Sequence, residues 1–373
     1  MSDNPVDTRD GITIGAKKLL ARAASADAPA FHALSVAIDD FFIPEESRLD
    51  ERTRSALAVL LRGMVETVEA EIREHGARLL SARGAAGAAR ALGDGGSSVL
   101  ARLSQSGLLR DPDLMAELIA RVRQELVGNA LPMSAPDDPE RPSLINRFVQ
   151  HPDRVVAAGA MGVLIAESRR RGSPESGQLT HTELPAELHH RLVWWVAAAL
   201  RERVVEAGEA DTGALDRALS EAAQRSLAAY DEGDRLEAAA MRFAAAIDAQ
   251  PGELPELLVE ALGDRRIVLF TALLAHALGV GYAIAREVVL DPAGDRLWLS
   301  LRALEFARDT IAMVGYALCE ADPRRDLESF ADTLHSVATI NAAEARDALA
   351  PLKLDPEYRA AVLALGRAQG RAR

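Results

Sequence analysis

Apolar residues recur at steps of three and four along much of the chain, the spacing of one helical face. The clearest case follows Asp50, and its recurring apolar positions are Leu57, Leu60, Leu61, Met64, Val65, Val68 and Ile72. Charged residues fill the opposite side, so this segment predicts an amphipathic helix whose start is capped near Asp50. An earlier helix is expected from about residue 15 towards residue 42, with an interruption at residues 27–29.

Prolines mark the expected starts of several later helices. Pro112, Pro152 and Pro185 each follow a turn or capping position and are separated by 40 and 33 residues. Proline is tolerated in a first helical turn because its missing N–H would have no partner there. These intervals fall in the range of helix-pair repeats, although they are irregular.

A second cluster of prolines predicts the main division of the chain. Four of them alternate with acidic residues between positions 131 and 143, which disfavours helix and indicates a stiff connector. The expected regions are a flexible tail (1–14), an N-terminal helical region (15–130), a proline-rich linker (131–143), a helical-repeat domain (144–350) and a C-terminal helix or tail (351–373).

Residues 267–285 form the longest stretch without a formal charge. Its 19 positions satisfy the length of a membrane span. However, Gly279 and Gly281 interrupt it, and charged pairs flank it on both sides. We therefore expect two buried helices joined at the glycines and no membrane span.

Composition supports an all-α fold. Apolar residues make up 49% of the chain but aromatic residues only 4%, so the core depends on Ala, Leu and Val, which suit closely packed helices. The net charge is −13, which argues against a nucleic-acid partner. A single cysteine, Cys319, and a first segment without a secretory pattern favour the reducing cytoplasm.

Two longer segments carry a family resemblance. Residues 31–75 include the run Ala-Ile-Asp-Asp-Phe-Phe-Ile-Pro-Glu-Glu-Ser-Arg from position 37, and residues 184–315 include Leu-Pro-Ala-Glu-Leu-His-His-Arg-Leu from position 184 and Gly-Asp-Arg-Arg-Ile-Val-Leu-Phe from position 263. In these motifs the chain resembles the bacterial domain-of-unknown-function family 2336, whose members are similar to HEAT-type helical repeats. The resemblance implies an all-α, HEAT-like array of antiparallel helix pairs, an α-solenoid, and brings no catalytic residues. A tetratricopeptide array is the weaker alternative, because only one partial copy of that pattern occurs, between Tyr230 and Pro251.

Motifs for several common chemistries are absent from the sequence. No lysine follows a glycine as a phosphate-binding loop requires, and no His-Glu-x-x-His string occurs. The best alternative metal site, and the basis of a weaker hydrolase hypothesis, is the group His181, Glu183, Glu187, His189 and His190. Capping and solvent-exposed roles explain such residues better, so no catalytic residue, cofactor or metal is predicted.

Adjacent aromatic residues are the predicted partner anchors. Two neighbouring side chains cannot both point into the core from one helical face, so Phe41, Phe42 and Trp194 are candidate contacts for a protein partner. The leading hypothesis is a non-catalytic, cytoplasmic helical-repeat scaffold or regulatory adaptor. The alternative is a small-molecule or lipid sensor with an apolar pocket between the helices of residues 254–318.

Overall fold

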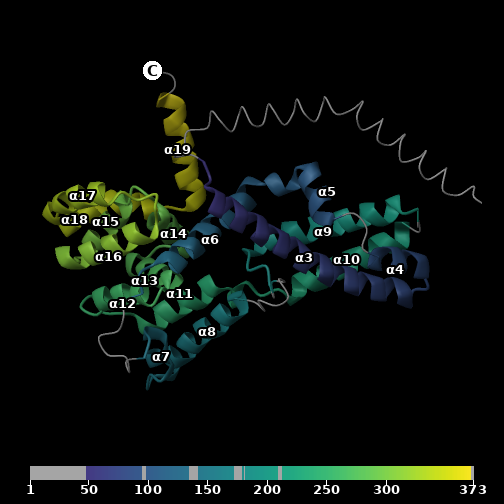
Figure 1. The fold of residues 1–373 in the computed structure, drawn as a ribbon, viewed down its shortest axis with the longest axis horizontal. Coiled ribbons are helices and arrows are strands. Elements are labelled where there is room, and N and C mark those ends of the chain that lie inside the picture. Colours follow the sequence, from purple (N-terminus) through teal and green to yellow (C-terminus); the bar gives the residue numbers. More distant parts are fainter. Residues whose placement is uncertain are drawn as a thin grey trace, which may run out of the picture. The chain divides into compact units, whose positions relative to one another are not determined.

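The computed structural model describes residues 48–94, 98–133, 142–171, 179, 181–208 and 212–370. Every regular element in these ranges is helical, which confirms the all-α prediction (Figure 1). Phe41 and Phe42, the earlier helix and the expected flexible tail lie outside the described residues.

The helices are mostly short. The first part of the chain contains α3 (Glu51–Ala82), α4 (Ala86–Gly93), α5 (Val99–Ser106), η2 (Leu108–Arg110), α6 (Pro112–Ala130), α7 (Leu144–Val149), α8 (Arg154–Arg171), α9 (Ala186–Glu206) and α10 (Thr212–Ala229). The second part contains η3 (Glu232–Asp234), α11 (Leu236–Ile247), α12 (Leu254–Gly263), α13 (Ile267–Leu278), α14 (Tyr282–Leu290), α15 (Asp295–Ala303), α16 (Arg308–Ala321), α17 (Leu327–Thr339), α18 (Ala342–Leu349), η4 (Ala350–Lys353) and α19 (Pro356–Gly370).

Local sequence signals account for several helix starts. The Asp50 carboxylate accepts a hydrogen bond from the Thr53 amide at 2.8 Å, as a residue that caps α3 should. Asp111 caps α6 in the same way, and Pro112 occupies the first helical turn as predicted. Pro185 precedes α9 rather than entering it, and α8 begins two residues after Pro152, so these two starts were predicted only approximately.

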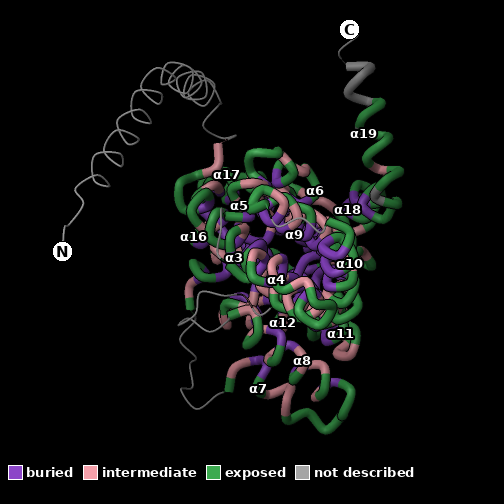
Figure 2. Tube along the Cα trace, turned by 90° about the vertical axis from the view of Figure 1, so that its right-hand side faces the viewer, coloured by how far each residue is buried: buried purple, intermediate pink, exposed green. Residues whose placement is uncertain are grey.

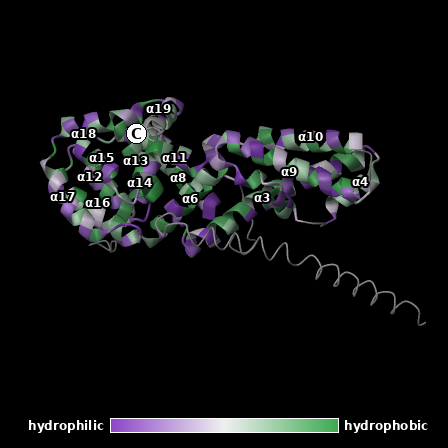
Figure 3. Cartoon of the chain, turned by 90° about the horizontal axis from the view of Figure 1, so that it is seen from above, coloured by the Kyte–Doolittle hydropathy of each residue, from purple (hydrophilic) through white to green (hydrophobic). Residues whose placement is uncertain are grey.

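The uncharged run forms two helices, as predicted. α13 ends at Leu278, Gly279 adopts the left-handed conformation with φ 66°, and α14 begins at Tyr282. Most α13 residues are buried, and both helices are coloured mainly as hydrophobic in Figure 3. Within the described residues, no individual helix has the length and apolarity to cross a membrane; α13 and α14 meet those criteria only together, across a bend of 116°.

The main core forms where α13 meets its neighbours. α13 packs against α6, α11, α12 and α14, and α11 also packs against α8. The largest fully buried side chains here include Trp298, Phe243 and Phe270. Figure 2 shows this interior in purple, whereas residues 357–362, in the first part of α19, are mostly exposed.

The proline-rich segment does not separate two cores. α6 precedes it, yet packs against α13, α14 and α16 beyond it. The helices on both sides of this segment belong to one compact unit, residues 55–373. The proline-rich segment therefore does not mark a boundary between two separate cores.

A second set of helices packs around α9. α9 packs against α4, α5 and α10. From α9, Arg203 donates to Glu69 of α3 at 3.1 Å and to the Leu92 carbonyl of α4 at 3.0 Å. One buried guanidinium thus holds three helices together.

Candidate functional site

α8 is apolar on two opposite faces. Its buried face packs against α7 and α11, and its members are Val156, Ala160, Val163 and Ala166. At 100° per residue, a second apolar row of Ala158, Met161 and Ile165 lies on nearly the opposite side of the helix, with Val155 on its flank at the N-terminal end. We call this second row the α8 face.

The α8 face is open to solvent. Val155 is 68% exposed, Met161 43% and Ile165 47%, and Gly162 beside them has no heavy atom within 4 Å of the position of a Cβ. Single exposed apolar residues are common on protein surfaces, but a row of them along one helix is typical of an interaction surface.

Cations stand at both ends of the α8 face. Arg154 precedes Val155 and Arg169 follows Ile165, both on the same side of the helix as the apolar row. Arg169 also forms an ion pair of 2.9 Å with Asp234, and both of these side chains are substantially exposed. The face is therefore an apolar strip with an arginine at each end, one of which is already paired with Asp234.

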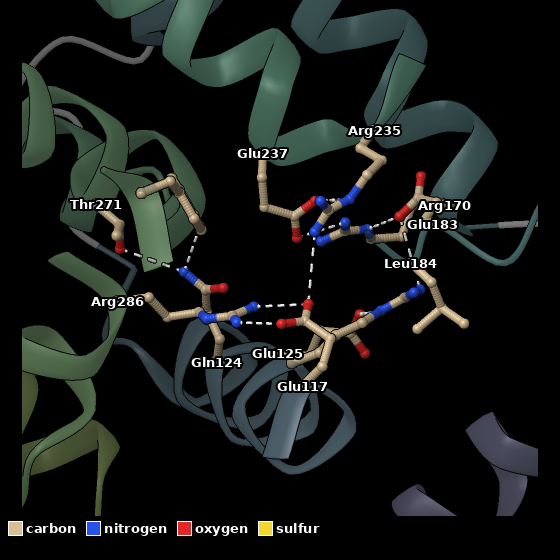
Figure 4. Close-up of polar contacts among 12 residues, drawn as sticks. Glu117, Gln124, Glu125, Arg170, Glu183, Leu184, Arg235, Glu237, Thr271 and Arg286 are labelled. Carbon is tan, nitrogen blue, oxygen red and sulfur yellow. Dashed lines mark hydrogen bonds and ion pairs between the residues drawn. The ribbon is translucent and has the colours of Figure 1, made fainter. Parts of the chain in front are cut away.

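A buried ionic cluster lies at the C-terminal end of α8. Arg170 donates to Glu183 and, at 2.7 Å, to Glu237 of α11, as Figure 4 shows. Around this centre the same cluster includes Glu117, Arg121 and Glu125 of α6, Arg235 before α11, and Arg286 of α14. Four arginines and four glutamates thus compensate one another and join segments distant in sequence.

Neutral side chains extend this cluster towards α13. The Gln124 amide donates to Tyr282 Oη at 2.7 Å and to Thr271 Oγ1 at 3.2 Å (Figure 4). Burial raises the pKa of Tyr282, which keeps its hydroxyl protonated. Burial alone would also raise the pKa of Glu237, but the charges of Arg170 and Arg235 outweigh it and lower that pKa to about 2. The cluster therefore remains ionised and structural at neutral pH.

The histidine group considered as an alternative metal site does not converge on one point. His189 is buried, with Nδ1 2.9 Å from Thr182 Oγ1 and its ring stacked on Tyr230 at 3.9 Å. His190 is exposed and accepts a hydrogen bond from Trp194, while Glu183 is held by Arg170. Across the described part of the chain, no group of three His, Cys, Asp or Glu side chains is arranged to hold a metal ion.

The environment of His189 predicts acid sensitivity. Burial, followed by the charges of His181 and His190, lowers the pKa of His189 from 6.5 to about 4. Since the unfolded chain then binds the proton more readily than the folded one, stability is complete above about pH 6.5 and falls as the pH approaches 4, with a loss of about 2 kcal/mol at pH 5. Urea unfolding at pH 7.5 and pH 5 measures this loss.

The variant His189→Gln should lose that part of the pH dependence, whereas His335→Gln, at an exposed position on α17, should retain it. An equal pH dependence in wild type and His189→Gln would show that His189 is not the responsible group.

Trp194 is the one predicted anchor that the structure describes. It is half-buried on α9, and its indole Nε1 donates to His190 Nε2 at 3.1 Å. This bond fixes the ring at the surface, so Trp194 remains a candidate partner contact. Phe41 and Phe42 stay predictions, because both lie outside the described residues.

One pocket lies only partly within the region predicted to form it, because it is also lined by residues outside 254–318, namely Ala244, Asp248, Ala249, Pro251 and Arg346. This pocket of about 390 Å³ is lined by residues of α11, α12, α13, α15 and α18 and the turns between them. Tyr282, the first residue of α14, does not line it and is bonded to Gln124 instead. Burial raises the pKa of the half-buried Cys319 thiol, which is also outside this pocket.

The α8 face was not predicted from the sequence, although a signal for it is present. Residues 154–167 are almost all small or apolar, with no polar side to the helix. A helix that is apolar all round is either buried on all sides or binds something. The same helical spacing also places Arg154 and Arg169 at the two ends of one row.

The family comparison covers the α8 face and the pocket. A family described as an uncharacterised protein conserved in bacteria (DUF2336) matches residues 138–350, which run from before α7 into η4. No curated protein and no solved structure matches the chain.

Proposed function

We propose that this chain, which belongs to the DUF2336 family of bacterial proteins, is a non-catalytic adaptor that binds a protein partner along the α8 face. The observation that carries the proposal is the row of exposed apolar side chains opposite the buried face of the same helix. Covering such a row removes apolar surface from water, which favours association by about 25 cal/mol per Å².

The partner segment is an amphipathic helix with acidic ends. Arg154 and Arg169 are 15 residues apart, so about 22 Å separates them along the helix. A partner helix that lies along α8 would contact Met161 and Ile165 with its own apolar stripe and place carboxylates near the two arginines. Against a second copy of α8, arginines would again face arginines at these ends, and like charges disfavour that pairing.

We further propose that the chain as a whole is a HEAT-like array of helix pairs that acts in the cytoplasm. Helices that follow one another in sequence pack together in several places, namely α9 with α10, α12 with α13, α13 with α14, and α16 with α17. Such pairs support a helical-repeat scaffold, which presents extended surfaces to partners. Trp194 on α9 would form a further contact.

The alternative function, a small-molecule sensor, is favoured by the pocket at the ends of α11, α13 and α15. It does not compete with the α8 face, because no α8 residue lines that pocket.

A paired substitution tests the α8 face. In Met161→Glu/Ile165→Glu, two carboxylates replace the central apolar contacts, and we expect the partner affinity to fall at least about 100-fold. Stability should change by no more than about 0.5 kcal/mol per site, because both side chains are exposed. The measurement is co-purification from native cells, followed by titration of the identified partner.

Val59→Glu provides the matched control, since Val59 is an exposed apolar residue on α3. Retention of the same partner by wild type and Val59→Glu, but not by the paired variant, supports the proposal. Arg154→Gln/Arg169→Gln should bind more weakly and with less dependence on salt. If all variants retained the partner equally, the proposal that the partner binds the α8 face would be refuted.

A further inference from the structure

The pocket between α11 and α15 lies where three helices end. Asp248 and Ala249 follow the last residue of α11, His276 and Ala277 belong to the last turn of α13, and Glu305 follows α15 shortly after its end. The last carbonyl groups of a helix have no partner within it, and its dipole is negative there. Three such ends on one pocket favour a positively charged occupant.

Two acidic residues turn the chain at this pocket. Asp248 and Glu305 both have left-handed backbones, with φ 43° and 66°, whereas Gly279 serves the same purpose at the end of α13. A side chain makes this conformation less favourable than it is for glycine. Unlike a glycine, each of these two residues places a carboxylate at the pocket.

The remaining polar groups leave the two carboxylates accessible. His276 Nε2 lies 3.0 Å from one oxygen of Asp248, and the second oxygen is free of that contact. Arg346 meets Glu305 only at 3.4 Å, with both side chains largely exposed. Besides His276, the rim therefore carries two carboxylates and one guanidinium, that of Arg346.

Beneath this rim the pocket is apolar. Ala244, Leu254, Leu273 and Ala303 are all buried and line its inner part. Its volume of about 390 Å³ is in the range of small-molecule sites. An inorganic cation would leave this lining unfilled, while a neutral hydrocarbon would not use the carboxylates.

We infer that this pocket binds an amphipathic amine, with the ammonium group at Asp248 and Glu305 and the apolar body against Leu254 and Leu273. The ammonium donates hydrogen bonds to the two carboxylates. This site is independent of the α8 face, so either inference can fail without the other.

Three probes with the same six-carbon chain but different head groups distinguish the contribution of charge to binding from that of apolar contact. Hexylamine, hexanol and hexanoate are titrated into the full-length ¹⁵N-labelled protein, and amide shifts of Ala277 and Leu304 report occupation. Hexylamine should bind at least about tenfold more tightly than hexanol, and hexanoate more weakly than both. Hexanoate binding as tightly as hexylamine, or no shift of these amides with hexylamine, overturns the inference.

Neutral replacements of the two acids then test whether their carboxylates bind the ammonium group. Asp248→Asn/Glu305→Gln should reduce hexylamine affinity about tenfold and leave hexanol affinity unchanged. Asn is suited to the left-handed position, so the turn after α11 is kept. Glu328→Gln, at an exposed acid in the first turn of α17, is the control and should bind both probes as wild type does. An unchanged preference for the amine in the double variant contradicts the assignment.

A lysine side chain of a protein would offer the same chemistry. Nα-acetyl-lysine methylamide carries that group together with two amides, which the buried lining cannot accommodate without unpaired polar atoms. Weaker binding of this compound than of hexylamine assigns the site to a free amine. Tighter binding would overturn the small-molecule assignment and indicate a lysine of a partner.

Discussion

Replacing Arg170 by Met is expected to lower the free energy of unfolding by about 3–5 kcal/mol, because it removes the central cation of the buried cluster. The Arg170 side chain is 10% exposed and bonds both Glu183 and Glu237, whose side chains are also buried. Without it, two carboxylates remain in the interior with fewer compensating charges. Urea-induced unfolding at pH 7.5 measures the change.

Arg171→Met is the matched control one position along the chain. The Arg171 side chain is 78% exposed and forms a single surface pair with Glu167 at 3.4 Å. Such pairs contribute little, so its loss should cost no more than about 0.5 kcal/mol. Adding Glu183→Gln and Glu237→Gln to Arg170→Met should recover part of the stability. Equal effects at positions 170 and 171 would mean that the cluster does not stabilise this fold.

Gly315→Ala is expected to destabilise the chain by about 3 kcal/mol, at the upper end of the usual cost of overpacking. A Cβ at Gly315 of α16 would overlap the ring of Phe330 on α17. That ring cannot move away freely, because Phe330 is buried and its centroid lies 4.6 Å from that of Trp298. One added methyl group therefore separates α16 from α17 or displaces a buried aromatic pair.

At a helical glycine with no neighbouring atoms, the same Gly→Ala substitution should raise the free energy of unfolding instead of lowering it. At Gly162 of α8 a Cβ meets no heavy atom within 4 Å, so Gly162→Ala should stabilise by about 0.5–1 kcal/mol through helix propensity. In the Gly315→Ala background, Phe330→Leu should restore part of the lost stability by removing the ring. Thermal unfolding of the two alanine variants compares them directly, and a stabilised Gly315→Ala would contradict this packing of α16 on α17.

The helical character of the chain could be predicted from short-range signals. Periodic apolar positions predicted α3, Asp111 and Pro112 predicted the start of α6, and Gly279 predicted the break between α13 and α14. These signals act within a few residues and do not depend on tertiary packing. The packing of α6 against α14 and α16 depends instead on contacts between residues more than 150 positions apart, which no local pattern encodes.

The same distinction applies to the sites. His181, His189 and His190 were grouped because they are near in sequence, yet His189 turns inward to Thr182 while His190 turns outward to Trp194. Conversely, Asp248 and Glu305 are far apart in sequence and meet at one pocket because separate helices end there. The apolar row of α8 was visible in the sequence, but which of its two sides is covered follows only from α7 and α11.

Site-specific photocrosslinking tests the central claim, that the α8 face is a partner surface, most directly. p-Benzoylphenylalanine is placed at Met161 or, as a control, at Val59, and the protein is irradiated in cells that express it natively. We expect one protein adduct at position 161 and none at 59, with the attachment mapped to an amphipathic helix that has acidic residues at both ends. Adducts of equal yield at both positions, no adduct at 161, or attachment to a segment of other chemistry would contradict the claim.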